Sequence, residues 1–415
     1  MKKLQAEGVD NKNISLPEQI AKRLGLAAGA RLDIAFRRGR VELLPDIHSL
    51  SRVYIEPTSR CNISCKACVR QAEGEPQGDM DMGLFRKLVV ELKRFPFLES
   101  VMLGGLGEPT THPHILEMIG EIKASGLRVE MVSNGTLLDE AMLKGLIAGR
   151  LDWLWVSLDG SDEALFEASR PGAKYKGVLA ALRRLRELNR DTENPVKLGL
   201  AYVVTKKNVP GLRKIERVAR KLGADRIIVS NVIPYTPEME KEMICAQALA
   251  INTFTTGVSG QISIDVPRMD VAPYTHNALL GLMSGGASLS LMGTEIGARE
   301  GECRFIRERC VIVRWDGKVA PCMGLMRDHT VYFGGGARRN KRYIVGDLLL
   351  RGLWDIWNDA DYMAFREKVA DFDFSPCHVC GGCYFNEDNA EDCHGNKFPA
   401  TCGGCLWAQG IIQCP

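Results

Sequence analysis

Residues 52–68 read RVYIEPTSRCNISCKAC, an apolar run followed at once by a cysteine-rich loop. The run Arg52–Glu56 is typical of a buried strand. Cys61, Cys65 and Cys68 follow with the spacing C-x3-C-x2-C, so three thiolates share one tight loop and can hold three irons of a [4Fe–4S] cluster. The fourth iron then stays open, and an open metal position favours catalysis over a structural role. A zinc site completed by a distant fourth ligand is the alternative.

Strands and helices alternate between residue 51 and about residue 270. Strands are predicted over 52–56, 100–103, 128–132, 153–158, 196–204 and 226–229, with a further strand over 262–266. Helices are predicted between them over 82–94, 114–125, 140–148, 175–188 and 209–222. This order predicts right-handed βαβ units around a parallel sheet, which binds ligands at the carboxyl ends of its strands. We therefore expect an α/β fold, a partial (β/α)6 barrel with the cysteines on its active face.

Composition excludes several classes of protein. The 415 residues are 45% hydrophobic and 25% charged, which is ordinary for a folded chain of roughly two to four domains. A net charge of +3 gives no global basic field for nucleic acid. The 14 cysteines are clustered and no signal peptide precedes them, so we expect a cytoplasmic metalloprotein with reduced thiols. The uncharged run 271–294 is rich in glycine and serine and predicts a loop or packed core, not a membrane span.

Polar loops follow the next three predicted strands. Their candidate ligand-binding residues are Gly104, Gly105, Gly107 and Glu108 after the second strand, Asn134 after the third, Ser157 at the end of the fourth, and Arg170 beyond it. Each alone is an ordinary turn or surface residue, but each lies where the active face of the barrel is expected. His112 and His114 come just after the glycines, and we expect both to be exposed at a helix start.

The cysteine spacing and these loops resemble the radical S-adenosylmethionine (radical SAM) enzymes. The resemblance implies that SAM chelates the open iron through its amino and carboxylate groups. One electron then cleaves SAM to methionine and a 5′-deoxyadenosyl radical, which abstracts a substrate hydrogen. It also implies that the glycine loop and Glu108 bind the SAM amino group, that Asn134 and Ser157 contact its ribose or carboxylate, and that Arg170 binds the carboxylate. Ala67 stands where the family commonly has an aromatic residue near the adenine.

The region from residue 303 onward carries ten cysteines. They are Cys303, Cys310, Cys322, Cys377, Cys380, Cys383, Cys393, Cys402, Cys405 and Cys414. Their order resembles the SPASM-type extension, which implies one or two auxiliary [4Fe–4S] clusters. We expect Cys303, Cys310 and Cys322 to share one site. Cys377 and Cys380 are expected to help hold the other, and a zinc ribbon is the alternative for Cys402 and Cys405. The isolated Cys245 is expected to be a buried small hydrophobe.

Residues 1–47 predict a small separate unit. A short strand at 14–17, a helix over 18–24 and a hairpin with arms 31–36 and 41–44 follow one another. This order resembles the AbrB/SpoVT-type swapped-hairpin domain, which implies a DNA-binding dimer. A hairpin with basic tips is also simply a solvated surface. So small a unit needs a second copy or the rest of the chain to bury its core.

The whole chain resembles the tungsten cofactor oxidoreductase radical SAM maturase group, through the start described above and the ending CGGCLWAQGIIQCP at 402–415. The resemblance implies a maturase that modifies a protein, a peptide or the pterin cofactor of a tungsten-type oxidoreductase. Ferredoxin or flavodoxin would be the electron donor. The predicted domains are 1–47, the barrel 51–270, a linker or lid 271–302, and the iron–sulfur domain 303–415.

Two other functions compete with the maturase. One is a regulator that binds DNA through residues 1–47 and senses redox state with its clusters; such binding falls steeply with salt. The other is an electron-transfer or scaffold protein, for which closed clusters suffice. The auxiliary clusters either accept an electron from a substrate radical or ligate the substrate.

Overall fold

The computed structural model describes residues 46–72, 74, 76–244, 303–375, 377, 383–399, 402–409, 412 and 415, and the backbone of strands elsewhere. Those strands include the antiparallel hairpin β3 (Leu32–Arg37) and β4 (Arg40–Pro45), which confirms the predicted hairpin. The short pair β1 (Val9–Asp10) and β2 (Asn13–Ile14) precedes it. The predicted helix 18–24, Cys245, Cys380 and Cys414 lie outside the described residues, as does most of 271–302.

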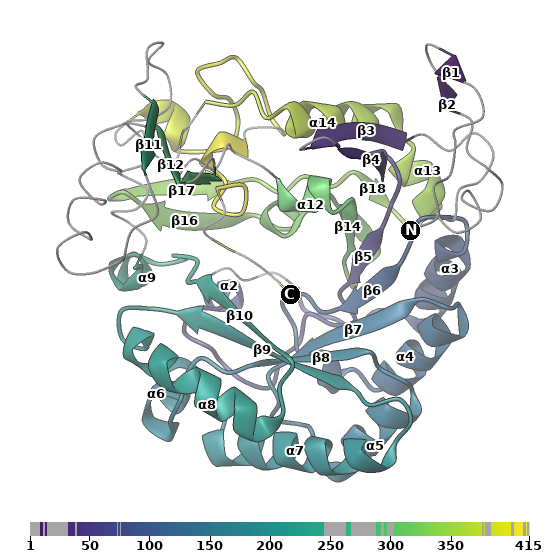
Figure 1. Cartoon of the computed structure of the whole chain (residues 1–415), viewed down its shortest axis with the longest axis vertical. Coiled ribbons are helices and arrows are strands. Elements are labelled where there is room, and N and C mark those ends of the chain that lie inside the picture. The colour runs from purple at the N-terminus through teal and green to yellow at the C-terminus, as the bar shows by residue number, and fades with distance from the viewer. Residues whose placement is uncertain are drawn as a thin grey trace.

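Six parallel strands form the barrel sheet, as the sequence predicts. They are β5 (Arg52–Ile55), β6 (Ser100–Leu103), β7 (Arg128–Ser133), β8 (Trp153–Ser157), β9 (Lys197–Val204) and β10 (Arg226–Asn231), each hydrogen-bonded to the next. The helices α3 (Met82–Leu92), α4 (Ile115–Ala124), α5 (Glu140–Ala148), α6 (Glu163–Ser169), α7 (Tyr175–Leu188) and α8 (Leu212–Leu222) lie along the outer side of the curved sheet (Figure 1). This arrangement confirms the α/β fold and brings the strand ends together at one face.

The sheet continues beyond β5 with strands from the C-terminal region. β14 (Cys310–Val313) pairs in parallel with β5, although the paired residues Arg52 and Cys310 are 258 positions apart in the chain. β15 (Lys318–Ala320) and β18 (Gly346–Asp347) then add antiparallel edges. The prediction that 262–266 joins the barrel sheet is wrong, because β11 (Ser263–Val266) pairs with β12 (Ser288–Leu291) in a separate sheet with β13 (Thr294–Ile296). The wholly buried CVIV run of β14 fits a sheet covered on both faces.

The C-terminal region shares the hydrophobic core of the barrel. Leu353, Ile356 and Trp357 of α13 (Leu353–Trp357) are almost fully buried in the same cluster as the inner residues of α3 and β5. Tyr362 and Phe365 of α14 (Ala360–Asp371) join them. A fully buried side chain of this size stabilises a fold by about 1.5–3 kcal/mol. The barrel and the cysteine-rich region therefore hold each other in place.

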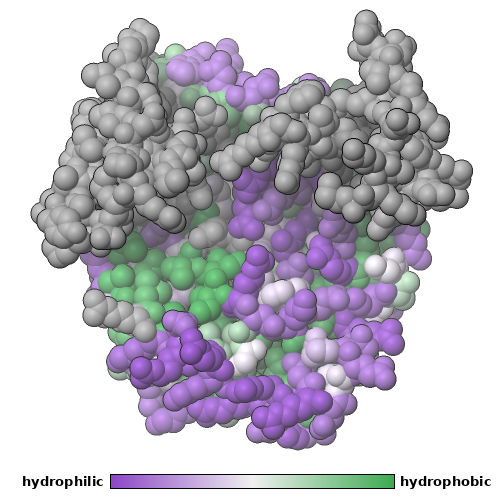
Figure 2. Space-filling view, viewed as in Figure 1, coloured by the Kyte–Doolittle hydropathy of each residue, from purple (hydrophilic) through white to green (hydrophobic). Residues whose placement is uncertain are grey.

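The outer helices follow the amphipathic pattern that their burial requires. The inner face of α7 buries Tyr175, Val178, Leu179, Leu182 and Leu185. Figure 2 shows that the surface over the outer helices is mostly hydrophilic, with an apolar patch on the same side of the molecule in the region of α9 (Pro237–Glu242) and β10. Among the described residues, no helix combines the length and apolar composition of a membrane span.

Candidate radical SAM site

The cysteine loop, residues 57–68, leaves the carboxyl end of β5 and carries Cys61, Cys65 and Cys68, all half-buried. Two backbone hydrogen bonds hold it against the end of α6 and the turn that follows. Ser64 donates to the Pro171 carbonyl at 3.1 Å, and Lys66 donates to that of Ser169 at 3.2 Å. The three thiols therefore lie at the carboxyl ends of the barrel strands, where the sequence predicts a ligand site.

Arg170 joins this loop to the fourth strand. Its Nη1 lies 3.5 Å from the Cys65 sulfur, and its Nε donates to a carboxylate oxygen of Asp159 at 2.7 Å. Burial raises the pKa of the Cys65 thiol, and the positive charge of Arg170 opposes that rise. A buried guanidinium fixed by Asp159 is therefore aimed at a sulfur, where it stabilises the thiolate form.

Asn134 approaches a second thiol from the end of β7. Its side-chain amide nitrogen lies 3.8 Å from the Cys61 sulfur and 2.9 Å from the Oδ1 atom of Asn62. Its own Oδ1 accepts hydrogen bonds from the backbone and hydroxyl of Thr136. The amide is thus fixed in one orientation with its N–H groups toward the cysteine loop.

Glu108 is buried beneath Asn134 and holds it. One carboxylate oxygen accepts the Asn134 backbone N–H at 2.6 Å, and the other accepts the Ser133 hydroxyl at 2.8 Å. That second oxygen also accepts the backbone and hydroxyl of Thr110. Burial raises the pKa of Glu108 above its ordinary value. Both oxygens are therefore occupied within the protein, and Glu108 is placed to position Asn134.

The glycine loop, residues 104–108, passes too close to its neighbours for larger side chains. A Cβ on Gly107 would lie 2.0 Å from the Thr58 carbonyl oxygen. Gly105 has a φ of +152° and faces Glu56, whose side chain a Cβ would meet at 2.7 Å. Gly104 is less constrained, because its nearest neighbour is Val132 at 3.6 Å. The glycines thus bring the backbone of β6 against the cysteine loop.

Four further residues from the sequence analysis lie in different surroundings. Ser157 lies half-buried at the end of β8, on the expected face. His114 is exposed as predicted, but the prediction for His112 is wrong, because it is only 3% exposed and its Nε2 lies 3.1 Å from the Met80 carbonyl oxygen. The turn before α4 folds that ring inward. Ala67 packs against an apolar cluster that includes Val232.

Sequence reasoning missed a buried ion pair beside the glycine loop. Glu56 is fully buried just after β5, and its two carboxylate oxygens accept hydrogen bonds from Arg327 Nη2 at 3.1 and 3.2 Å. It also accepts the Leu106 backbone N–H at 3.1 Å. A charged residue at the end of a buried strand is a signal for such a site, but its partner from the C-terminal region could not be identified from the sequence.

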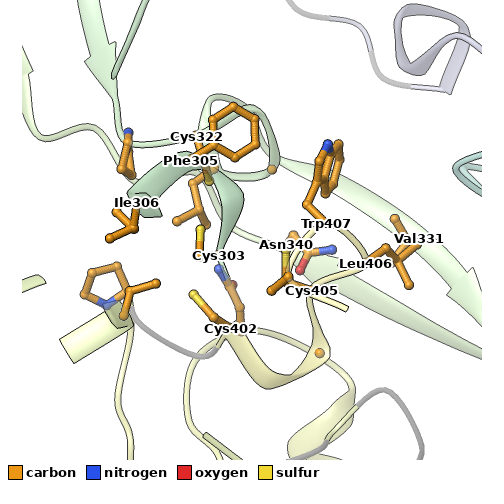
Figure 3. Close-up of a pocket in the computed structure, with 18 of the residues that line it drawn as sticks. Cys303, Phe305, Ile306, Cys322, Val331, Asn340, Cys402, Cys405, Leu406 and Trp407 are labelled. Atoms are coloured by element: carbon orange, nitrogen blue, oxygen red, sulfur yellow. The ribbon is translucent and has the colours of Figure 1, made fainter. Parts of the chain in front are cut away.

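Four cysteines of the C-terminal region surround one cavity of about 60 Å³. They are Cys303, Cys322, Cys402 and Cys405, and Figure 3 shows them with Phe305, Ile306 and Trp407 around the same space. Burial raises the pKa of the Cys322 and Cys402 thiols well above the ordinary value. Among the described residues, no three histidine, cysteine or carboxylate side chains converge closely enough to hold a single metal ion.

The other described cysteines lie apart from this cavity. Cys310 lies on β14 in an apolar cluster that Cys303 and Cys322 border, and burial raises its pKa to about 12. Cys377 is buried, Cys383 lines a second cavity of about 420 Å³, and Cys393 is exposed. The grouping of Cys310 with Cys303 and Cys322, and that of Cys377 with Cys380, stay predictions.

Comparison with known proteins identifies the family. Residues 55–207 match the radical SAM superfamily, and residues 303–384 match SPASM, an iron–sulfur cluster-binding domain. The chain is 31% identical, over 88% of its length and 96% of the relative's, to the tungsten-containing aldehyde ferredoxin oxidoreductase cofactor-modifying protein of Pyrococcus furiosus. The chain belongs to the radical SAM family. It is an enzyme, and its domains are those that use [4Fe–4S] clusters and SAM.

Other relatives share parts of this radical SAM enzyme. The Fe-coproporphyrin III synthase of Methanosarcina barkeri is 32% identical over 42% of each chain. The crystal structure of Streptococcus suis SuiB bound to S-adenosylmethionine has a TM-score of 0.52 and 17% identity, covering 81% of this chain and 74% of that one. That likeness supports the fold. The matches to enzyme domains leave the AbrB-like resemblance and the DNA-binding alternative without support.

The residues at the first site fit a [4Fe–4S] cluster. Three thiols stand on one loop, and N–H groups of Arg170 and Asn134 are aimed at two of them. Hydrogen bonds to sulfur and partial burial are the means by which proteins tune such clusters.

Proposed function

We propose that this enzyme binds SAM at a cluster held by Cys61, Cys65 and Cys68 and uses it to modify the cofactor of a tungsten-dependent oxidoreductase. When bound and reduced, the cluster supplies one electron that cleaves SAM to methionine and a 5′-deoxyadenosyl radical. The observation that carries the proposal is the approach of Arg170, at the end of α6, and Asn134, at the end of β7, to two of the three thiols.

The neighbouring residues have separate tasks in this proposal. Arg170, fixed by Asp159, stabilises the thiolate of Cys65 and offers positive charge to the SAM carboxylate. The side-chain amide of Asn134 directs its N–H groups toward Cys61. Ser157, at the end of β8, is placed to contact the ribose or carboxylate of SAM. The glycine loop offers backbone groups to the SAM amino group. Because Glu108 already accepts four hydrogen bonds, its contribution is to hold this wall of the site rigid.

Support for this substrate comes from the Pyrococcus furiosus relative, whose name describes modification of a cofactor of a tungsten-containing oxidoreductase. That relative is covered over 96% of its length, so the match includes the C-terminal region as well as the barrel. A pterin cofactor is therefore the first substrate to test, ahead of a peptide or the oxidoreductase protein. Ferredoxin or flavodoxin is the proposed electron donor.

The auxiliary clusters are also proposals. We assign one to Cys303, Cys322, Cys402 and Cys405, because these four line one cavity. The remaining cysteines after residue 376, which are Cys377, Cys380, Cys383, Cys393 and Cys414, supply ligands for a second. Each cluster then has enough thiolates for four irons.

The test is 5′-deoxyadenosine formation without oxygen. The reconstituted enzyme is reduced with dithionite, given SAM, and the product is quantified by chromatography with and without a pterin or the cofactor-free oxidoreductase. 5′-Deoxyadenosine is expected from the parent and from Cys245→Ala, the matched control that removes a cysteine assigned to no cluster. None is expected from Cys61→Ala. Equal product from Cys61→Ala contradicts the proposed site. If a peptide stimulates 5′-deoxyadenosine formation and a pterin does not, the proposed substrate becomes a peptide.

A further inference from the structure

Arg338 is a buried arginine on an otherwise accessible strand. It lies on β17 (Gly336–Asn340), which pairs with β16 (His329–Phe333), and it faces Val331 across that pair. Its side chain is 6% exposed, whereas the neighbouring Arg339 on the opposite face is exposed. The guanidinium packs so closely on Gly404 that a Cβ there would lie 2.8 Å from its central carbon. The structure thus turns this one arginine inward.

The side chain of Arg338 lies between the two groups of C-terminal cysteines. It lines the cavity of Cys303, Cys322, Cys402 and Cys405, and it also lines the second cavity with Cys383. Its charge acts on the thiols of Cys377 and Cys405. The same charge acts on Cys402. One guanidinium therefore forms a wall shared by both sets of thiols.

The described residues offer the charge of Arg338 no carboxylate partner. Nη1 donates to the side-chain oxygen of Asn386 at 2.9 Å, and Nε is buried without a hydrogen-bond partner. No described carboxylate lies within ion-pair distance of it, and Asp388 acts on its charge only from farther away. A buried cation is costly unless an anion compensates it. Among the described residues, the anions that Arg338 can meet are the cysteine thiolates and the cluster that they would hold.

We propose that Arg338 is a positioning residue that donates N–H groups to the auxiliary cluster of Cys303, Cys322, Cys402 and Cys405 and raises the reduction potential of that cluster. This inference rests on the proposed cluster assignment and adds how the cluster is tuned. Uptake of one electron makes a thiolate-bound cluster more negative, so a fixed positive charge beside it favours the reduced state. Hydrogen bonds to the sulfurs act in the same direction. Because Arg338 lines both cavities, a change in the charge of either cysteine group would affect the other group through this guanidinium.

The test is a redox titration followed by electron paramagnetic resonance, in the full chain with Cys61→Ala. That background removes the SAM-binding cluster, so the measurement does not depend on SAM cleavage. Arg338→Gln removes the charge and Arg338→Lys keeps it. Arg339→Gln is the matched control, because it removes an exposed charge from the adjacent residue of the same strand. Iron content is measured for every variant.

Arg338→Gln is expected to hold its iron and to show at least a tenfold lower ratio of reduced to oxidised cluster at the parental midpoint, which is about 59 mV for a one-electron couple. Arg338→Lys should shift less, and Arg339→Gln should titrate like the parent. A loaded Arg338→Gln with an unchanged potential overturns the proposal, as does an equal shift in Arg339→Gln. If Arg338→Gln loses its iron, a loaded Arg338→Lys near the parental potential supports the proposal. Loss of iron from both shows a purely structural role and overturns it.

Discussion

Gly107→Ala is the smallest change that tests how the glycine loop supports the cysteine loop. The new Cβ would lie 2.0 Å from the Thr58 carbonyl oxygen and 2.7 Å from that of Arg60. Cβ atoms essentially never approach a heavy atom closer than 3.0 Å, so the two backbones must separate by about 1.0 Å. Both obstacles are backbone atoms within three residues of Cys61, and neither can move away by rotating a side chain.

The magnitude follows from the contacts that this movement disturbs. The Glu108 backbone N–H donates to the Arg60 carbonyl at 2.8 Å, and a 1.0 Å separation breaks that hydrogen bond. Its loss costs about 0.5–1.5 kcal/mol, and overpacking against backbone costs about 1–3 kcal/mol. We therefore expect the free energy of unfolding to fall by about 2–4 kcal/mol. A displacement of this size at a reacting site lowers the rate by about 100-fold.

Urea unfolding of the iron-free chain, followed by tryptophan fluorescence, and 5′-deoxyadenosine formation by the loaded enzyme measure the two effects. Gly104→Ala is the matched control in the same motif, because its Cβ meets only Val132 at an ordinary 3.6 Å. It should stay within about 1 kcal/mol of the parent and keep its activity. The reasoning is refuted if Gly107→Ala unfolds at the parental urea concentration, or if both glycine variants lose the same activity.

Three further predictions concern other contacts. Glu56→Gln should lower the free energy of unfolding by about 3–5 kcal/mol, because it removes the buried anion that Arg327 meets at 3.1 Å. Adding Arg327→Met should restore most of that loss in the same urea assay, and a simple sum of the two single losses would contradict the pairing. Burial raises the folded-state pKa of Glu108 above 4.5, so the folded protein holds this proton more tightly than the unfolded chain, and stability should fall as pH rises from 4.5 through that pKa. The fall should be smaller in Glu108→Gln, in which Glu56, whose pKa burial also raises, still contributes, and parallel profiles would show that Glu108 is not a source of it. Cys402→Ala should lose about four irons per chain in a colorimetric assay. Cys310→Ala should keep them, because Cys310 does not line the cavity. Equal losses of iron from the two variants would place Cys310 among the ligands.

The barrel could be predicted from the sequence because its signals are local. The apolar runs of β6 and β8 and the helical periods of α5 and α7 each lie within one short segment, and their bounds agree with prediction to within a residue. The same holds for the cysteine loop and the loops after each strand. Parallel strands place their carboxyl ends together, so the neighbourhood of Cys61 and Asn134 follows from topology.

The parts that could not be predicted depend on contacts between distant segments. The pairing of β14 with β5 has no local signature beyond a four-residue apolar run. The Arg327 partner of Glu56 and the inward turn of Arg338 arise only once the C-terminal region is packed on the barrel. For the same reason, spacing suggested that Cys310 belongs with Cys303 and Cys322, whereas the cavity brings Cys402 and Cys405 to those two.

The position of β14 also determines when the sheet can be completed during synthesis. β5 emerges from the ribosome 258 residues before the strand that covers its outer edge. Until then, a buried strand of the finished enzyme has an open row of backbone donors and acceptors, which is a template for unwanted pairing between chains. Nascent chains with such edges depend on chaperones or on slow translation. A gene cut before residue 303 is therefore expected to give an aggregating product, and the iron–sulfur region acts as the last structural part of the barrel.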